Sequence, residues 1–139
     1  MQTQTQALIG AIQDRIEDGQ IPKVEIMVPL VSIEKELETI LCWIREEIEQ
    51  SPITIPLGTM IETPRGALIA GELAKHVDFI SFGTNDLTQM TFGFSRDDVE
   101  SSVISEYIHK EILEESPFST LDQTGVGELV KTAIQRSRK

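Results

Sequence analysis

The sequence predicts an α/β fold, namely part of a (β/α)8 barrel with about three parallel strands and flanking helices. Two observations support this prediction, namely the alternation of two kinds of segment and the length of the chain. Short apolar segments bounded by Gly or Pro alternate with longer segments in which apolar residues recur every three or four positions. This alternation is typical of right-handed βαβ units, which build doubly wound sheets and (β/α)8 barrels. A complete barrel takes roughly 250 residues, so we expect residues 1–139 to form a partial barrel domain.

The first part of the chain is predicted to hold two helices separated by a strand. Residues 8–16 carry apolar side chains at helical spacing, and this pattern stops at Gly19. Residues 24–30 form a short apolar segment that is typical of a strand buried in a parallel sheet. We expect Ser32 to cap the next helix, whose apolar stripe covers residues 33–48.

Two more strands are predicted in the middle of the chain. Residues 53–62 are expected to form the second strand, and Thr63 and Pro64 then provide an N-cap and a first-turn proline for a helix that extends to Ala74. Residues 77–82 are expected to form the third strand.

The last part of the chain is predicted to contain a long loop and two helices. The helical periodicity lapses over residues 83–98, so we expect a loop there, and loops of that length commonly serve function. Helical spacing returns over residues 99–112 and again over residues 129–134, on either side of Pro117.

The charge balance argues against polyanionic partners. The formal net charge is −11 and the basic residues form no stripe, so neither nucleic acid nor an anionic membrane surface is an expected partner. A phosphorylated substrate would need a metal ion or local arginines to overcome this charge. No apolar stretch approaches the length of a membrane span, and we expect a cytoplasmic protein. The single cysteine, Cys42, is expected to be a buried packing residue.

Two acidic residues follow predicted strands. Glu62 ends the second strand and Asp86 follows the third, and parallel-sheet proteins place their active sites at these carboxyl ends. Two carboxylates in one cleft suit Mg²⁺, which commonly takes one or two protein carboxylates together with water and substrate oxygens. The spacing alone also allows a structural explanation, in which Glu62 helps to start a helix and Asp86 caps a turn.

The segment Gly83-Thr84-Asn85-Asp86 offers several hydrogen-bond donors beside Asp86. Glycine permits close approach of the backbone to a ligand, and the Thr84 hydroxyl and the Asn85 amide can donate to a carboxylate or phosphate. A tight turn would explain the same four residues without any ligand.

Two longer stretches resemble the phosphoenolpyruvate-utilising enzymes, a family that includes the pyruvate, phosphate dikinases. They are residues 58–68, Gly-Thr-Met-Ile-Glu-Thr-Pro-Arg-Gly-Ala-Leu, and residues 79–98, Phe-Ile-Ser-Phe-Gly-Thr-Asn-Asp-Leu-Thr-Gln-Met-Thr-Phe-Gly-Phe-Ser-Arg-Asp-Asp. Residues 26–29 look like the preceding strand of that family, and residues 116–130 are similar to the dikinases in particular. The resemblance extends over nearly the whole chain from Pro22.

The resemblance implies a specific site. It makes Glu62 and Asp86 ligands of Mg²⁺, and it makes Glu62, Gly83, Thr84, Asn85 and Asp86 contacts to pyruvate or phosphoenolpyruvate. The dikinases interconvert ATP, pyruvate and phosphate with AMP, phosphoenolpyruvate and diphosphate through an enolate, and a phosphohistidine on a separate domain carries the phosphate. Magnesium would stabilise the charge that develops on the enol oxygen.

Other parts of the family's machinery have no counterpart in the matching motifs. The substrate-binding arginines of earlier strands and the proton-donating cysteine of a later strand are absent, so we expect no catalytic residue in this chain. Arg65 and Arg96 are expected to be surface charges, and His76 and His109 to be surface or boundary residues. The chain is therefore expected to be an internal fragment that is inactive alone.

Other assignments remain open. The chain could belong to a phosphoenolpyruvate synthase or to a phosphoenolpyruvate-protein phosphotransferase. It could also be a noncatalytic binding or assembly module, because three parallel strands leave unpaired backbone groups at both sheet edges. These edges, and the dimeric state of the family's enzymes, lead us to expect a homodimer or another form of self-association.

Overall fold

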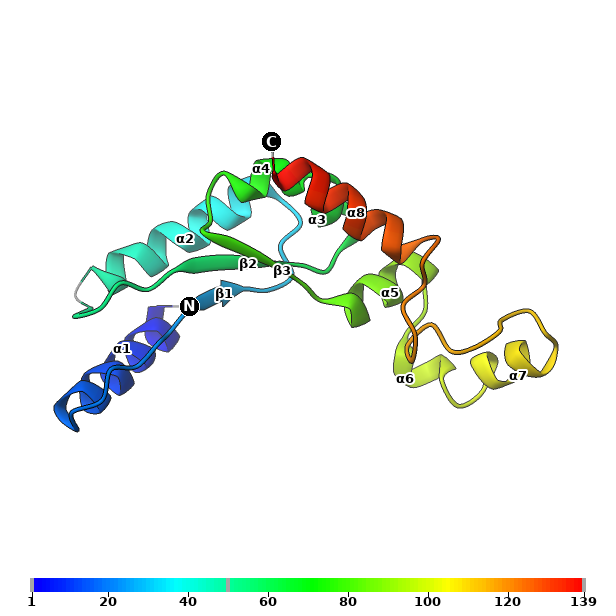
Figure 1. The fold of residues 1–139 in the computed structure, drawn as a ribbon, viewed down its shortest axis with the longest axis horizontal. Coiled ribbons are helices and arrows are strands. Elements are labelled where there is room, and N and C mark those ends of the chain that lie inside the picture. Colours follow the sequence, from blue (N-terminus) through cyan, green and yellow to red (C-terminus); the bar gives the residue numbers. More distant parts are fainter. Residues whose placement is uncertain (1, 50, 139) are drawn as a thin grey trace.

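The computed structural model describes residues 2–49 and 51–138, which form one open sheet with helices around it (Figure 1). The elements in this part of the chain, in order, are α1 (Gln2–Glu17), β1 (Ile26–Val28), α2 (Glu34–Ile48), β2 (Leu57–Ile61), α3 (Pro64–Leu68), α4 (Ala70–Ala74), β3 (Phe79–Phe82), α5 (Thr84–Phe92), α6 (Arg96–Val99), α7 (Val103–His109) and α8 (Val126–Ser137).

The three strands are parallel and lie in the order β1-β2-β3. Ile26 pairs with Leu57, and Gly58 pairs with Phe79, so consecutive strands are neighbours throughout. The predicted fold class, an α/β partial barrel with three parallel strands and flanking helices, is confirmed. Each strand is shorter than the apolar segment in which it was predicted. Strand β1, for example, ends at Val28, before Pro29 and Leu30, and Leu30 has a positive φ of 55°.

Helices α2, α3, α4 and α8 lie on the same side of the sheet in Figure 1. Helix α8 packs on α3 and α4, although more than fifty residues separate them in the chain. A Cβ atom on Gly71 would lie only 2.9 Å from the carbonyl oxygen of Arg136, and the Arg136 guanidinium donates to the carbonyl oxygen of Leu68. The core beneath these helices consists of Ile12, Val28, Val31, Leu37, Leu41, Ile44, Ile55, Leu57, Ile61, Ala67, Ala70, Leu73 and Ala133.

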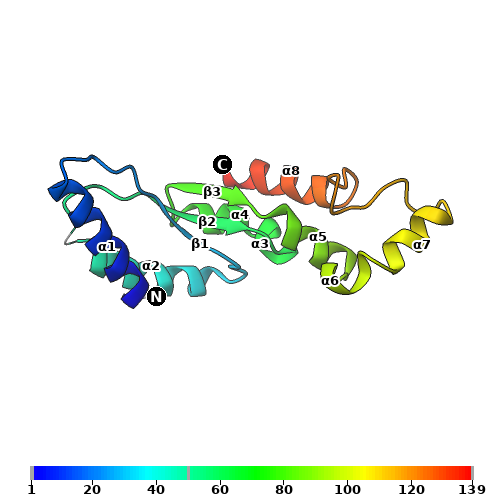
Figure 2. The same cartoon turned by 90° about the horizontal axis from the view of Figure 1, so that it is seen from below.

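Both views show an elongated molecule with helices at its two ends (Figures 1 and 2). At one end α1 packs on α2, and Gln6 Nε2 donates to Glu47 Oε2 over 2.9 Å. At the other end lie α6 and α7. The predicted N-terminal helix is confirmed, and it ends before Gly19, whose φ is +79°.

Two predictions about α2 are wrong. Ser32 does not cap the helix, because Ile33 occupies the N-cap position and the Ser32 hydroxyl donates to Thr63 Oγ1 over 2.8 Å instead. Cys42 is exposed rather than buried, since the buried stripe of α2 consists of Leu37, Leu41 and Ile44. The apolar neighbours of Cys42 in the sequence do not show which way its side chain points, because adjacent residues of a helix are about 100° apart around the axis.

The predicted start of the helix after β2 is confirmed. The Thr63 side chain accepts a hydrogen bond from Gly66 N over 2.9 Å, and Pro64 is the first helical residue. The predicted single helix to Ala74 is divided in two, because Ile69 leaves helical geometry with φ −107° and ψ 16°.

The prediction of a loop over residues 83–98 is wrong. This segment contains α5, which ends at Gly93 in a left-handed conformation with φ 67°, and then α6. Leu87 and Thr88 are buried, and α5 contacts α3 and α8, so tertiary packing stabilises a helix whose composition resembles that of a loop. The helix expected over residues 99–112 is shorter in the structure. Residues Val103–His109 form α7, and Val99 is the last residue of α6.

The helix expected over residues 129–134 is confirmed as part of α8. Within residues 2–49 and 51–138, no helix is long and apolar enough to cross a membrane.

Asp122 holds the start of α8. Its Oδ2 accepts from the backbone N–H groups of Gly125 and Val126 at 2.9 and 3.0 Å, and its Oδ1 accepts from the hydroxyl of Thr124 at 2.9 Å. Burial alone would raise the pKa of Asp122, but hydrogen bonds from Val126, Thr124 and Gly125 together lower this pKa below its usual value.

We therefore expect Asp122→Ala to lower the free energy of unfolding by about 1 kcal/mol near neutral pH, as for loss of a helix cap. Because the pKa of Asp122 is lowered in the folded state, this contribution is present above the unfolded pKa of about 3.9 and is lost as the pH falls through the folded pKa. Urea unfolding at several pH values would measure it. The matched variant Asp14→Ala, at an exposed site in α1, should show no comparable loss, and an equal loss in both variants would contradict the assignment.

Candidate functional site

Glu62 follows β2 directly and is buried, with only 5% of its surface exposed. Its Oε1 accepts a hydrogen bond from the backbone N–H of Leu30 over 2.6 Å, which ties the end of β2 to the segment after β1. A buried carboxylate needs such donors, because its removal from water is otherwise costly. The orientation of Glu62 is thus set by the neighbouring strand.

Gly83 follows β3 directly and lies against Glu62. The Gly83 N–H donates to the carbonyl oxygen of Ile61 over 3.1 Å, which continues the pairing of the two strands. A Cβ atom at this position would lie 2.4 Å from Glu62 Oε2 and 2.8 Å from the Met60 sulfur. The φ of Gly83 is −94°, so the glycine is required by this close approach and not by its backbone conformation.

The first turn of α5 holds the other predicted site residues. Thr84 and Asn85 are exposed, and Asp86 is half-buried and accepts from Gln89 Nε2 over 2.9 Å. Asp86 stands three residues after Gly83, at the N-terminal end of the helix. Backbone N–H groups in a first helical turn have no intrahelical acceptor, so this end of α5 carries a positive potential that favours anions.

Arg96 is a further candidate that the sequence analysis missed. Its Nη1 donates to Asn85 Oδ1 over 3.2 Å, its backbone N–H donates to Gln89 Oε1 over 2.8 Å, and its guanidinium lies 5.6 Å from the centre of the Phe118 ring. Arg96 is a surface charge as expected, since its side chain is 41% exposed and its Nε donates to Glu100 Oε2 over 3.1 Å, and its contact with Asn85 is the feature that was not predicted. Recognition of residues 84–92 as a helix that turns back at Gly93 would have brought Arg96 close to Asn85.

A small pocket of about 200 Å³ opens beside these residues. It is lined by Thr84, Asn85, Thr88, Arg96 and the segment from Pro117 to Leu121. The segment 117–121 precedes Asp122, which anchors it to the start of α8. The pocket therefore combines hydroxyl and amide groups with one guanidinium, which are the groups that bind a small carboxylate or phosphate.

The five residues predicted as the site come from the ends of β2 and β3. The structure places Glu62 against Gly83, and the chain from Gly83 to Asp86 is continuous at the start of α5. Glu62 and Asp86 offer carboxylate oxygens, which are the hard ligands that Mg²⁺ prefers. The tight turn considered for residues 83–86 is replaced by a helix start.

Arg65, His76 and His109 are not among the residues that line this pocket. Arg65 is exposed, and its guanidinium donates to the carbonyl oxygen of Ser32. His109 is exposed at the end of α7, as expected. His76 is half-buried and contacts the side chain of Glu34 on α2.

Comparison with known proteins gives one family over the whole length. Residues 1–139 match the family model described as PEP-utilising enzyme, PEP-binding domain. Similar curated proteins include "Pyruvate, phosphate dikinase 2" of Oryza sativa subsp. japonica, with 48% identity over 98% of this chain, and "Pyruvate, phosphate dikinase" of Clostridium symbiosum, with 46% identity over 98%. "Pyruvate, phosphate dikinase" of Rickettsia prowazekii is 44% identical over 99% of this chain. The chain spans 16% of the length of each of these three relatives.

The different surroundings of Gly83 and Gly10 predict opposite effects on stability when each glycine is replaced by alanine. Gly83→Ala should lower the free energy of unfolding by about 1–3 kcal/mol, because the new methyl group displaces the Glu62 carboxylate. Gly10→Ala in α1, where the added Cβ meets no atom of another segment within 4 Å, should raise it by about 0.5–1 kcal/mol. Urea unfolding of both variants is the measurement, and unchanged stability of Gly83→Ala would contradict the contact.

Proposed function

The chain belongs to the PEP-utilising enzyme family, in which it matches the PEP-binding domain, and we propose that it forms the pyruvate- and phosphoenolpyruvate-binding part of a pyruvate, phosphate dikinase. On this proposal residues 1–139 lie within one barrel domain. The observation that supports the proposal most is the buried Glu62 carboxylate, which lies against Gly83 where β2 and β3 end side by side. Both residues lie within the motifs that resemble the family.

Glu62 and Asp86 are the proposed ligands of Mg²⁺. The Leu30 N–H holds one oxygen of Glu62, and the other oxygen lies at Gly83, toward the start of α5. Asp86 would supply the second carboxylate from the first turn of α5. When bound, Mg²⁺ would neutralise negative charge on substrate oxygens.

Thr84 and Asn85 are the proposed contacts to the substrate's anionic groups. Both are exposed at the positive end of α5, where a hydroxyl and an amide can donate hydrogen bonds. Because Arg96 donates to the Asn85 oxygen, the NH₂ group of Asn85 is left to donate to a substrate oxygen. Arg96 itself adds a guanidinium beside the pocket, and this group also forms an ion pair with Glu100 over 3.1 Å.

We expect the 139-residue chain to show no full reaction alone. The proposed residues bind and orient, and none of them is assigned to transfer a proton or to carry a phosphoryl group. The family relationship also permits a phosphoenolpyruvate synthase or a phosphoenolpyruvate-protein phosphotransferase as the parent enzyme, and the relatives at 44–48% identity favour the dikinase. A cytoplasmic location stays a prediction, since similar proteins include a chloroplastic one from Arabidopsis thaliana.

A metal titration tests the proposed site. We expect saturable binding of Mg²⁺ by calorimetry, strengthened by oxalate, which imitates the enolate of pyruvate. Asp86→Asn and Glu62→Gln should each weaken binding at least about tenfold, because loss of a group that only orients a ligand already costs about 10- to 100-fold. The matched control Asp97→Asn, at an exposed acid of α6, should bind as the unaltered chain does. Equal binding by Asp86→Asn and Asp97→Asn would contradict the site.

The same titration tests whether Arg96 contributes to binding of the anion or to binding of the metal. Arg96→Gln should weaken binding of oxalate and leave binding of Mg²⁺ alone unchanged, because Arg96 is proposed to attract the anion. Arg15→Gln on α1 is the matched control for the lost charge. A loss of Mg²⁺ affinity in Arg96→Gln would show that Arg96 acts by holding the metal site in shape.

We also propose that the chain self-associates through its sheet edges. Within the part of the chain that the structure describes, β1 and β3 each pair only with β2, so each offers one unpaired edge. Because the net charge of −11 opposes association, the average mass in light scattering should rise with protein concentration and with salt, as the screening length falls from about 30 Å at 0.01 M to about 10 Å at 0.1 M. A constant monomer mass together with a cooperative melt would contradict this.

A further inference from the structure

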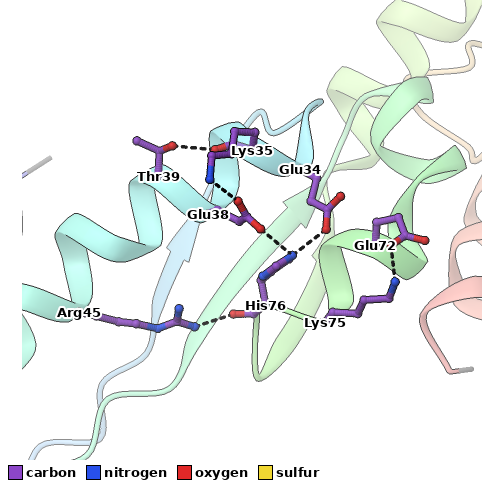
Figure 3. Close-up of polar contacts among 8 residues, drawn as sticks. All are labelled: Glu34, Lys35, Glu38, Thr39, Arg45, Glu72, Lys75 and His76. Carbon is purple, nitrogen blue, oxygen red and sulfur yellow. Dashed lines mark hydrogen bonds and ion pairs between the residues drawn. The ribbon is translucent and has the colours of Figure 1, made fainter.

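Three side chains with metal-binding groups meet between α2 and the segment that joins α4 to β3. Figure 3 shows Glu34 and Glu38, which are one turn apart on α2, pointing toward His76 in the segment between α4 and β3. The His76 Nε2 atom lies 2.8 Å from Glu34 Oε1 and 3.6 Å from Glu38 Oε1. One nitrogen and two carboxylate oxygens thus lie within 4.8 Å of one another.

The cluster is independent of the proposed substrate site. None of its three residues lies in the motifs at residues 58–68 or 79–98, and none contacts Glu62, Gly83 or Asp86 through a hydrogen bond that the structure describes. The three residues come from two separate segments, so the fold and not the sequence spacing brings them together.

The surroundings hold His76 and Glu38 in place. Arg45 Nη2 donates to the carbonyl oxygen of His76 over 2.8 Å, and the His76 N–H donates to Leu73 O over 3.1 Å, so the backbone at His76 is bound on both sides. Lys35 Nζ binds Glu38 Oε2 over 2.7 Å, and this leaves Oε1 facing the imidazole. The His76 side chain is only 23% exposed, which restricts its motion.

One of the two distances from the imidazole matches the ligand spacing around a tetrahedral ion, and the other lies about half an ångström below it. Ligands at about 2.0–2.2 Å from a tetrahedral Zn²⁺ ion are about 3.4 Å from one another. The separation of 3.6 Å between His76 Nε2 and Glu38 Oε1 already matches this value. The separation of 2.8 Å to Glu34 Oε1 is that of a hydrogen bond, and it would widen by about half an ångström once a metal replaced the shared proton.

We propose that Glu34, Glu38 and His76 bind one divalent transition-metal ion of the zinc type. Each residue supplies one atom, and water completes the coordination. An imidazole ligand favours Zn²⁺ over Mg²⁺, so this site differs in chemistry from the proposed Mg²⁺ site. Binding needs the lone pair of His76 Nε2, and the proton from that nitrogen leaves to solvent or is relocated to Nδ1.

The ion would join α2 to the connection between α4 and β3. Helix α2 and that connection are otherwise linked here by Arg45 and by the histidine–carboxylate contacts (Figure 3). An ion that binds the folded chain and not the unfolded one stabilises the fold by mass action. The function of the site is therefore structural, and Zn²⁺ should raise the melting temperature of the chain.

The chain's two histidines provide a matched test. We titrate ZnCl₂ into the 139-residue chain by calorimetry and expect one saturable site. His76→Gln, Glu34→Gln and Glu38→Gln should each weaken this site at least about tenfold. His109→Gln, at the exposed histidine of α7, and Cys42→Ser, at the exposed thiol of α2, should leave it unchanged.

A second measurement observes the two imidazoles directly. In the chain labelled with ¹⁵N at histidine, Zn²⁺ should shift the Nε2 resonance of one imidazole and leave the other in place, and His109→Gln should remove the resonance that does not shift. No saturable uptake of Zn²⁺, or a shift confined to His109, would overturn the proposal. Far-UV circular dichroism confirms that each variant is folded.

The test of the Zn²⁺ site can be distinguished from the test of the proposed Mg²⁺ site. Asp86→Asn should retain Zn²⁺ binding at His76 and lose Mg²⁺ binding, and His76→Gln should show the reverse. If Asp86→Asn instead removed the Zn²⁺ site, the ion would bind at the carboxylates of the substrate site and the inference would be wrong.

Discussion

The parallel pairing of β2 with both of its neighbours is the constraint on which the remaining structure depends. It aligns Ile61 with Phe82, so that the residues directly after the two strands, Glu62 and Gly83, meet at the same edge of the sheet. The Leu30 N–H then reaches Glu62 from the third member of the sheet. The carboxylate thus lies where all three strands end, bonded by the Leu30 N–H and close to Gly83, and the helix with Asp86 starts directly after Gly83.

The helices around the sheet are stabilised more by packing than by their own length. Helices α3 and α4 have five residues each, and helices this short are unstable in isolation. Helix α8 contacts both, and the approach of Gly71 to the backbone of Arg136 brings the helices close together. The first turn of α8 is in turn held by Asp122, which also anchors the segment that lines the pocket beside Asn85.

The two proposed cation sites differ in ligand chemistry and in origin. The site at Glu62 and Asp86 offers only oxygen ligands and forms at the ends of consecutive strands, as open α/β proteins and barrels place their ligands. The cluster at His76 includes an imidazole and forms between α2 and the connection from α4 to β3 (Figure 3). In a chain with a net charge of −11, cations at both places would also reduce the repulsion among carboxylates.

The sequence by itself determined the class of fold, the three strands in their order, the helix start at Thr63 and Pro64, and the family, because hydrophobic periodicity, capping residues and long motifs are local signals. It did not predict that residues 84–92 are helical, that Arg96 lies beside Asn85, that Cys42 is exposed or that Ser32 bonds Thr63. The contact of Arg96 with Asn85 follows from the helix between them, and the other features depend on packing between segments distant in the chain. Helix α5 forms because Leu87 and Thr88 are buried, and His76 meets Glu34 because α2 and α4 cover the same sheet. Local propensity contributes less free energy than such burial, so only the tertiary structure decided these features.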